Sequence, residues 1–269
     1  MTHFLLQVDF QETKINHMKK KFPYRYRVLI LLFSLILITY LDRVCISLVG
    51  VRIKGDFKLS NAQFGWVLSA FALAYALFEI PSGILGDRIG QRKVLIRIVI
   101  WWSVFTALTG AATGLVTLMI TRFLFGMGEA GAYPNSSAAI SKWFPRNETA
   151  KGMSSCAIGS NTGAALAPLI VVPLAVKFGW RAPFFVNGCL GLVWVLVCYF
   201  WFRDFPSQKK SVSAEELRYI EENRSFEKGE HPVSWSALLK NRNVWFLALM
   251  FMTSQWANYF FVGWMPIFL

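Results

Sequence analysis

The sequence predicts an all-α integral membrane protein, and three observations support that fold class. Hydrophobic residues make up 55% of the 269 residues and the mean hydropathy is +0.44, which an ordinary soluble domain of this length would not show. Seven apolar segments are each long enough to cross about 30 Å of hydrocarbon as a helix. The net charge of +13 comes largely from Lys and Arg that flank these segments, as the positive-inside rule requires, and this distribution argues against nucleic-acid binding.

Six of the apolar segments form an expected transmembrane bundle over residues 28–202. The first, residues 28–51, follows a basic arm, residues 1–27, that we expect to be flexible and cytoplasmic; Met18 within it is a second plausible start. No small-residue cleavage site follows the first segment, so we expect a retained helix rather than a signal peptide. The other five segments are residues 63–85, 94–115, 118–140, 152–176 and 182–202.

A polar linker and a seventh crossing follow this bundle. Residues 203–243 are expected to form a cytoplasmic linker in which Ser213-Ala214-Glu215-Glu216 opens an amphipathic surface helix with a capping box. Residues 244–269 form the seventh expected crossing. The basic loops predict that the N-terminus and the linker lie in the cytoplasm. We expect a multi-pass protein of the cell inner (plasma) membrane. One exception on the opposite side is the group Arg52, Lys54 and Lys58, offset only by Asp56.

A dense charged turn separates the second and third expected crossings. Residues 83–93 read G-I-L-G-D-R-I-G-Q-R-K, so the apolar character stops and resumes within a few residues and the two helices must reverse direction there. Gly83 and Gly90 allow close backbone approach and sharp bending. We interpret the turn as a structural element that holds the two helices together on the cytoplasmic side. The alternative is a basic loop that only sets the topology. The residues of this motif are Gly83, Asp87, Arg88, Gly90, Arg92 and Lys93.

Ionisable residues inside the apolar segments are the strongest functional signal, because each is costly in lipid unless it faces a cavity or a partner. Asp42 and Arg43 lie past the middle of the first segment, and Arg122 and Glu129 lie in the fourth. Arg122 and Glu129 share one helix face, where both can line one cavity. Asp42 and Arg43 are adjacent and point about 100° apart, so they cannot face the same spot.

A cavity that contains both arginines and carboxylates suits an anionic substrate. Guanidinium groups bind carboxylates through paired hydrogen bonds. Acidic groups in a low-dielectric setting gain proton affinity and can titrate during transport. The combination predicts proton-coupled uptake of an organic anion. The alternative, that each acid neutralises an arginine in the empty cavity, stays open, and both can hold in different states of one cycle.

The pattern G-x-x-x-D-R-x-G-x-R-K of the charged turn resembles the signature between the second and third helices of the major facilitator superfamily of secondary transporters. The similarity covers nearly all of residues 24–269. It implies a first bundle of six helices built as 3+3 inverted repeats, a cytoplasmic linker and one helix of a second bundle that is otherwise absent. Four further segments resemble the anion:cation symporter family, which includes bacterial sugar-acid and hexuronate transporters: Tyr40-Leu41-Asp42-Arg43, Tyr75 with Pro81, the run from Arg122 to Pro134, and Trp143-Phe144-Pro145.

The same resemblance implies roles for individual residues in a proton-driven symporter of carboxylates. Arg43 would contact the substrate carboxylate, and Asp42 and Glu129 would form the proton relay. Tyr75 would be a polar contact in the cavity. Arg122 would add positive potential or steer the Glu129 proton. The resemblance implies no cofactor other than the coupling ion, H+.

Two further segments resemble positions that contact substrate in this family. Ser160 or Asn161 is a candidate polar contact, although bacterial sugar-acid carriers often have a glutamine there. The alternative is a packing face formed by Gly159, Gly163 and Ala167. The aromatic side of the cavity would include Asn258, Tyr259 and Trp264, although aromatic residues are also expected near any membrane interface.

The absence of most of the second bundle is the largest departure from the family. Family members alternate access by rocking two bundles around a midplane site, and the turn at Asp87 acts as a cytoplasmic gate that locks against a helix of the second bundle. We expect either a truncated copy of a transporter or half-units that associate. In both cases the missing bundle or a second copy is needed for a complete transport path.

The leading functional prediction is a secondary transporter for a small organic anion, such as a hexuronate, aldarate or aldonate, that works in the lipid bilayer by alternating access. The rival prediction is a non-transporting membrane protein, a sensor, assembly partner or remnant that keeps the fold. An enzyme is not expected, because no Ser/His/Asp, metal-ligand or phosphate-loop constellation lies within the helices. The four cysteines lie in apolar segments without paired spacing, which predicts packing residues rather than disulfides or a zinc site.

Overall fold

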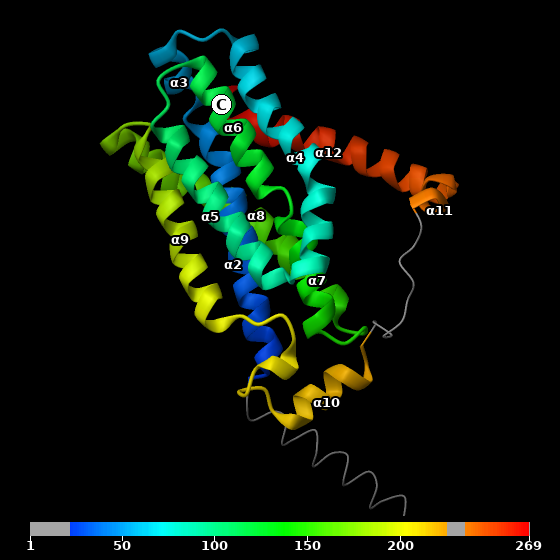
Figure 1. The fold of residues 1–269 in the computed structure, drawn as a ribbon. Helices are drawn as coiled ribbons and strands as arrows, with labels where there is room; N and C mark the ends of the chain where they lie inside the picture. Colours follow the sequence, from blue (N-terminus) through cyan, green and yellow to red (C-terminus); the bar gives the residue numbers. More distant parts are fainter. Residues whose placement is uncertain (1–21, 225–234, 269) are drawn as a thin grey trace, which may run out of the picture.

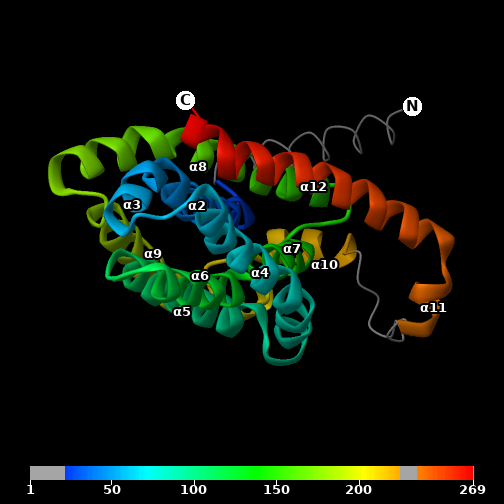
Figure 2. The same ribbon diagram turned by 90° about the horizontal axis from the view of Figure 1, so that it is seen from above.

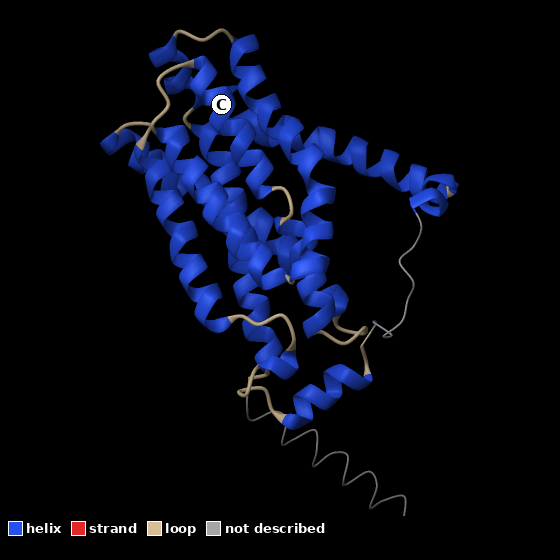
Figure 3. Cartoon of the chain, in the orientation of Figure 1, coloured by secondary structure: helices blue, strands red, loops and turns tan. Residues whose placement is uncertain are grey.

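The computed structural model describes residues 22–224 and 235–268, and the regular secondary structure of these residues is helical (Figure 3). Among them, six spans are long and apolar enough to cross a membrane, as expected for the bundle. These spans are α2 (Tyr24–Leu48), α4 (Asn61–Ile89), α5 (Gln91–Gly110), the pair α6 (Leu115–Glu129) and α7 (Ala132–Trp143), α8 (Thr149–Phe178) and α9 (Ala182–Trp201). Outside the described residues lie residues 1–21 of the expected flexible arm, residues 225–234 of the expected linker, and Leu269.

Helix α2 lies inside the bundle and packs against α7, α8 and α9, while α4 pairs with α6 and α5 pairs with α9 (Figures 1 and 2). Glycines set how close these pairs come. A Cβ atom at Gly163 of α8 would lie 2.2 Å from the carbonyl oxygen of Leu37 in α2. One at Gly126 of α6 would lie 2.5 Å from the carbonyl oxygen of Phe71 in α4. Only glycine fits such backbone contacts, so small residues fix the spacing of these helices.

The fourth crossing is broken, although a continuous helix over residues 118–140 is expected from the sequence. Helix α6 ends at Glu129, and Gly131 adopts a φ of +142° before α7 begins at Ala132. Such a φ is open to glycine and strained for other residues. Pro134 lies in the first turn of α7, where its missing N–H removes no helical hydrogen bond. The break therefore places two helix ends, with their free backbone groups, beside Glu129.

Most of the exceptional charges of residues 52–58 lie in an additional short helix, and Lys58 follows its end. Helix α2 ends at Leu48, before the expected residue 51, and α3 (Gly50–Phe57) follows it. Asp56 of α3 accepts a hydrogen bond from the indole N–H of Trp180 (2.6 Å), and the Arg181 guanidinium stacks 4.2 Å from the centroid of the Trp180 ring. The Asp56 contact joins α3 to the connection between α8 and α9, so this acidic residue has a structural role at this end of the bundle.

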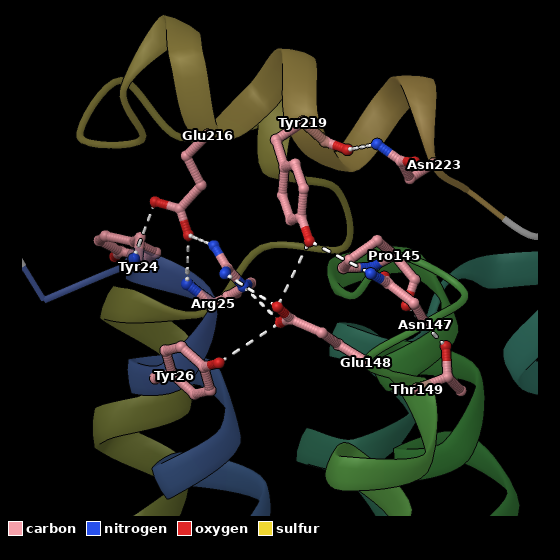
Figure 4. Close-up of polar contacts among 10 residues, drawn as sticks. All are labelled: Tyr24, Arg25, Tyr26, Pro145, Asn147, Glu148, Thr149, Glu216, Tyr219 and Asn223. Carbon is pink, nitrogen blue, oxygen red and sulfur yellow. Dashed lines mark hydrogen bonds and ion pairs between the residues drawn. The ribbon is translucent and has the colours of Figure 1, made fainter. Parts of the chain in front are cut away.

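The opposite end of the bundle is held by the linker (Figure 4). Helix α10 (Ala214–Glu222) begins after Ser213, whose side chain accepts the Glu216 N–H (3.1 Å), one half of the expected capping box. In the other half of a capping box, the Glu216 carboxylate would accept the Ser213 backbone N–H. Here it accepts the N–H groups of Tyr24 (2.9 Å) and Arg25 (3.0 Å) instead. The Arg25 guanidinium also joins Glu216 (3.2 Å) to Glu148 (2.9 Å). Glu216 therefore caps the first turn of α2 from the linker.

The seventh expected crossing is helical but is not among the six candidate spans. Helix α12 (Arg242–Phe268) follows the short α11 (Trp235–Lys240). Its middle contains the polar run Thr253, Ser254 and Gln255, which lowers its apolar content. It lies obliquely against the α2 side of the bundle (Figures 1 and 2). This position brings α12 over a cavity among α2, α4 and α6.

Candidate functional site

A cavity of about 360 Å³ lies between α2, α4, α6 and α12, in the half of the bundle nearer α3. A volume of this size is typical of small-molecule sites. Its polar lining residues include Arg43 and Ser47 of α2, Ser69 of α4, Arg122 of α6, and Gln255 and Tyr259 of α12. The structure thus brings four predicted residues to one cavity: Arg43, Arg122, Tyr259 and Trp264. Gln255 was missed, and its only signal is a polar side chain within an apolar segment.

Arg43 forms an ion pair with Glu129 at the cavity wall, its Nε donating to Glu129 Oε1. The Glu129 side chain is fully buried, whereas 11% of the Arg43 side chain is exposed. The rings of Tyr40 and Tyr75 lie 4.9 and 4.5 Å from the Arg43 guanidinium carbon. Cation–π contact with these rings positions the arginine without using its N–H groups. Tyr75 therefore acts on this site through Arg43.

Arg122 has no comparable carboxylate partner. It is 2% exposed, its Nε has no hydrogen-bond partner, and no ion pair joins it to another residue in the described part of the chain. The rings of Phe71 and Phe125 lie 4.9 and 4.4 Å from its guanidinium carbon. Glu129, on the same helix, is engaged by Arg43. Arg122 therefore keeps its donors in a pocket of low dielectric, where a carboxylate or sulfonate is the matching acceptor.

Asp42 faces away from the cavity, as its angular offset from Arg43 predicts. It is 2% exposed and faces Thr106 of α5 and Asn187 of α9. Neither of its carboxylate oxygens completes a hydrogen bond with the described protein. The two predicted acids thus have different neighbours: Glu129 is paired with the cavity residue Arg43, and Asp42 faces Thr106 and Asn187.

Ser160 and Asn161 are not brought to this cavity. Helix α8 turns Gly159 and Gly163 toward α2, so the Ser160 hydroxyl donates to the Ala157 carbonyl oxygen of its own helix (2.7 Å) and Asn161 is exposed. This arrangement corresponds to the packing face that the sequence left as the alternative. Of the other aromatic-side residues, Trp264 lines the cavity, and the side chain of Asn258 lies outside the described part of the structure.

The charged turn makes the expected sharp reversal. Gly90, with a φ of +94°, is the single residue between α4 and α5. Asp204, which follows α9 and is not part of the motif, accepts the N–H of Arg92 (2.7 Å) in the first turn of α5. Arg92 also donates from its guanidinium to the Tyr199 carbonyl oxygen. The turn is therefore fastened to the end of α9 by a residue that the motif does not contain.

The remaining motif residues differ in their surroundings. Asp87, Arg88 and Lys93 are exposed, and no ion pair joins them to any residue that the structure describes. A Cβ atom at Gly83 would meet its nearest neighbour at an ordinary 3.6 Å, but one at Gly86 would lie 1.6 Å from an Asn135 side-chain oxygen. The glycine that the packing requires here is thus Gly86 rather than Gly83.

Comparison with protein-family models matches residues 32–269 to the Major Facilitator Superfamily. The chain belongs to this superfamily. The match includes the cavity arginines and the charged turn, so the resemblance seen in the sequence is confirmed. As a superfamily member with six candidate spans, the chain is a multi-pass membrane protein.

Several curated relatives of this superfamily chain are named as anion transporters. The "Probable sulfoacetate transporter SauU" of Cupriavidus necator is 32% identical over 94% of this chain and 59% of that protein. The D-galactonate transporter of Escherichia coli O6:H1 is 33% identical over 79% of this chain and 49% of that protein. The hexuronate transporter of Bacillus subtilis is 32% identical over 93% and 57%. The chain spans about half the length of the curated relatives it matches.

Solved structures support the same fold. The inward-facing, unoccupied form of a bacterial homologue of the human lysosomal transporter Spinster superposes with a TM-score of 0.75, covering 93% of this chain and 56% of that chain at 24% identity. The inward-facing, occupied form gives a TM-score of 0.63, covering 69% of this chain and 46% of that chain at 29% identity. The described helices of this superfamily chain therefore correspond to roughly half of a facilitator fold.

Proposed function

We propose that this chain supplies the anion-binding half of a proton-coupled secondary transporter for a small organic anion, a sugar acid such as a hexuronate, aldarate or aldonate. It acts as a transporter and not as an enzyme. The relatives named for sulfoacetate, D-galactonate and hexuronate support this proposal, because each of those substrates carries a carboxylate. A second bundle or a second copy completes the transport path, since the fold alternates access between two bundles.

The observation that carries the proposal is the buried, unpaired Arg122. A guanidinium group without an acidic partner is costly in a low-dielectric interior, and an entering carboxylate or sulfonate removes that cost. The same cavity offers neutral hydrogen-bonding groups at Gln255 and Tyr259. These groups can bind substrate hydroxyls, which distinguish sugar acids from simple carboxylates.

The ion pair of Arg43 and Glu129 can open, which gives the site a second state in which Arg43 binds the substrate. The part of Arg43 that remains exposed faces the cavity, so a substrate carboxylate can take the place of Glu129 on its guanidinium. Glu129 is then buried without its ion-pair partner and receives a proton. Binding of the anion and protonation of Glu129 or Asp42 are thereby linked.

The sum of interior charges favours a proton as the coupling ion. Asp42, Arg43, Arg122 and Glu129 sum to zero when all four are ionised. A monovalent anion alone would leave one negative charge in the bundle interior, whereas an anion with one proton leaves none. Since uncompensated charge is costly at this depth, symport of one proton with one monovalent anion is the favoured stoichiometry.

The charged turn supplies the gate in this proposal. Its exposed Asp87, Arg88 and Lys93 lie at the end of the bundle where the linker is attached. Because the loops at this end are basic, we place it on the cytoplasmic side of the inner (plasma) membrane. There they are available to lock against a second bundle. Gly83, Gly90 and Arg92 shape and fasten the turn.

Binding to the full chain in nanodiscs tests the proposal. D-galactonate, D-glucuronate and sulfoacetate are titrated against the native chain, Arg122→Ala, Arg43→Ala and, as a matched control, Arg97→Ala, which removes an exposed arginine of α5. We expect saturable binding that strengthens as the pH falls from about 8 to about 5, a loss of about tenfold or more in the first two variants, and no change in the third. A folded native chain that binds none of these anions at any pH would favour a non-transporting sensor or assembly partner.

A further inference from the structure

A second group of buried polar residues lies outside the cavity, on α2, α5 and α9. It consists of Asp42 on α2, Thr106 on α5 and Asn187 on α9, which are 2%, 2% and 0% exposed. The Asp42 carboxylate faces the Thr106 hydroxyl and the Asn187 amide. No polar side-chain atom of the three completes a hydrogen bond with the described protein. None of the three lines the cavity of Arg43 and Arg122.

Helix packing fixes the positions of these groups. A Cβ atom at Gly188 of α9 would lie 2.9 Å from the Ser103 carbonyl oxygen of α5, so the two helices touch backbone to backbone beside Asn187. Buried polar groups without partners are rare in proteins and destabilise the fold. The chain nevertheless has a hydroxyl and an amide beside a carboxyl group, where Val and Leu would pack without that cost. Their presence indicates a role other than packing.

The chemistry of Thr106 and Asn187 suits a carboxyl group that changes its protonation state. A hydroxyl can donate or accept, and a carboxamide has both a donor and an acceptor. Such neighbours can donate to an ionised carboxylate and can also accept the proton of the neutral acid. An arginine or lysine in direct contact would stabilise only the ionised form.

The charged surroundings of Asp42 come from two helices. Of the charged groups, Glu129 and then Arg122 of α6 act on it most strongly, and the Cys45 thiol lies one turn along α2. Helix α9 contains no charged residue, and the basic residues of α5, at positions 92, 93 and 97, lie toward the linker end. In α8 the charged residues are Lys151 and Lys177, near its two ends, and Tyr259 of α12 acts on Arg43. The immediate neighbours of the carboxylate, Thr106 and Asn187, are therefore neutral, and the charges that act on it are those of Glu129 and Arg122.

We propose that Asp42, Thr106 and Asn187 form an ion-coupling site behind the substrate cavity, in which Thr106 and Asn187 are positioning residues that hold the Asp42 carboxyl group in both of its protonation states. This inference rests on the proposed function, because it takes Asp42 as a residue that receives the coupling proton. The proton and the anion occupy different sides of α2 and act on each other through adjacent residues, Asp42 and Arg43.

An infrared titration of the full chain in nanodiscs tests this site without any substrate. The C=O stretching band of protonated carboxyl groups is followed against pH, and the part lost in Asp42→Asn is assigned to Asp42. In Thr106→Val and Asn187→Leu we expect Asp42 to stay protonated to higher pH, by about one pH unit or more, because the ionised carboxylate loses neighbouring groups that are able to donate to it. The frequency of the band should also change, because the neutral acid loses its acceptor. Thr106→Ser keeps the hydroxyl and should restore the native titration.

Thr109→Val is the matched control. Thr109 is also buried on α5, but its hydroxyl donates to the Phe105 carbonyl oxygen of its own helix (2.8 Å), so this variant should titrate like the native chain. An Asp42 band with native midpoint and frequency in the Thr106 and Asn187 variants would overturn the positioning roles and leave proton coupling intact. An Asp42 that does not titrate between about pH 4 and 10 would overturn both. A band that sodium, but not potassium, removes at constant pH would assign the site to sodium and overturn the proton site.

Discussion

Arg43 and Arg122 line one cavity but differ in how their charges are balanced. Arg43 is paired with the fully buried Glu129, and Arg122 rests on two phenylalanine rings with no acidic partner among the residues that the structure describes. Breaking a buried pair costs more than forming it gains, because the remaining partner is left charged and desolvated. The Arg43 and Glu129 pair is therefore a site where a single substitution has a large effect on stability.

We predict that Glu129→Gln destabilises the folded chain by about 3–5 kcal/mol, because Arg43 is left without its partner. The double variant Arg43→Gln/Glu129→Gln should regain much of that loss, since both charges are removed together. Thermal unfolding of the native chain, the two single variants and the double variant in the same detergent gives the coupling free energy. Additive effects of the two single changes would show that the ion pair does not contribute as a unit.

Helix α10 of the linker caps the N-terminus of α2. Pro23 precedes the first turn of α2 and provides no side-chain cap, so the N–H groups of Tyr24 and Arg25 need an outside acceptor. Glu216 supplies it, and its negative charge also favours the positive end of the α2 dipole. The linker is thereby attached to the helix that contains Asp42 and Arg43.

We predict that Glu216→Gln speeds hydrogen exchange at the Tyr24 and Arg25 amides by about tenfold or more, because hydrogen bonds to a charged acceptor contribute about 1.5–3 kcal/mol. Exchange measured by mass spectrometry on peptides from the start of α2 reports the change. Glu222→Gln is the matched control in the same helix. Among the described residues, Glu222 pairs with the exposed Arg218 alone (2.6 Å), so its loss should leave these amides unchanged. Equal exchange in the two variants would contradict the cap.

At the scale of the whole molecule, the interior charges form one balanced set across α2 and α6. Asp42 and Glu129 are acidic, Arg43 and Arg122 are basic, and the members lie on both sides of α2. A bound anion disturbs this balance wherever it enters. Because these groups titrate together, the protonation of all of them, and not of any single residue, determines how many protons accompany the anion.

We predict that binding of a monovalent sugar acid to the full chain takes up about one proton near neutral pH. Calorimetric titrations in buffers of different ionisation enthalpy measure this number directly. Asp42→Asn or Glu129→Gln should lower the uptake, because each removes one group that can receive the proton, while Arg97→Ala should leave it unchanged. Anion binding without proton uptake in the native chain would contradict proton coupling and leave the anion site in place.

Much of the fold could be predicted because it depends on local features of the chain. The length of each apolar segment predicts a crossing, and the charged turn at Asp87 predicts a reversal, so the six crossings agree within a few residues. The break at Gly131 was not predicted. A glycine and a proline in an apolar run are compatible with either a continuous or a broken helix, and only contacts with neighbouring helices decide between them.

The sequence by itself determined the class of the protein, its superfamily and the residue types of the site, because hydropathy, charge and motif spacing are properties of consecutive residues. Only the tertiary structure decided which groups meet. It pairs Glu129 with Arg43, leaves Arg122 unpaired, turns Asp42 toward Thr106 and Asn187, and keeps Ser160 and Asn161 out of the cavity. The physical reason is that the rotation of each helix is set by close contacts between distant residues, such as Gly163 against Leu37, which no local pattern specifies.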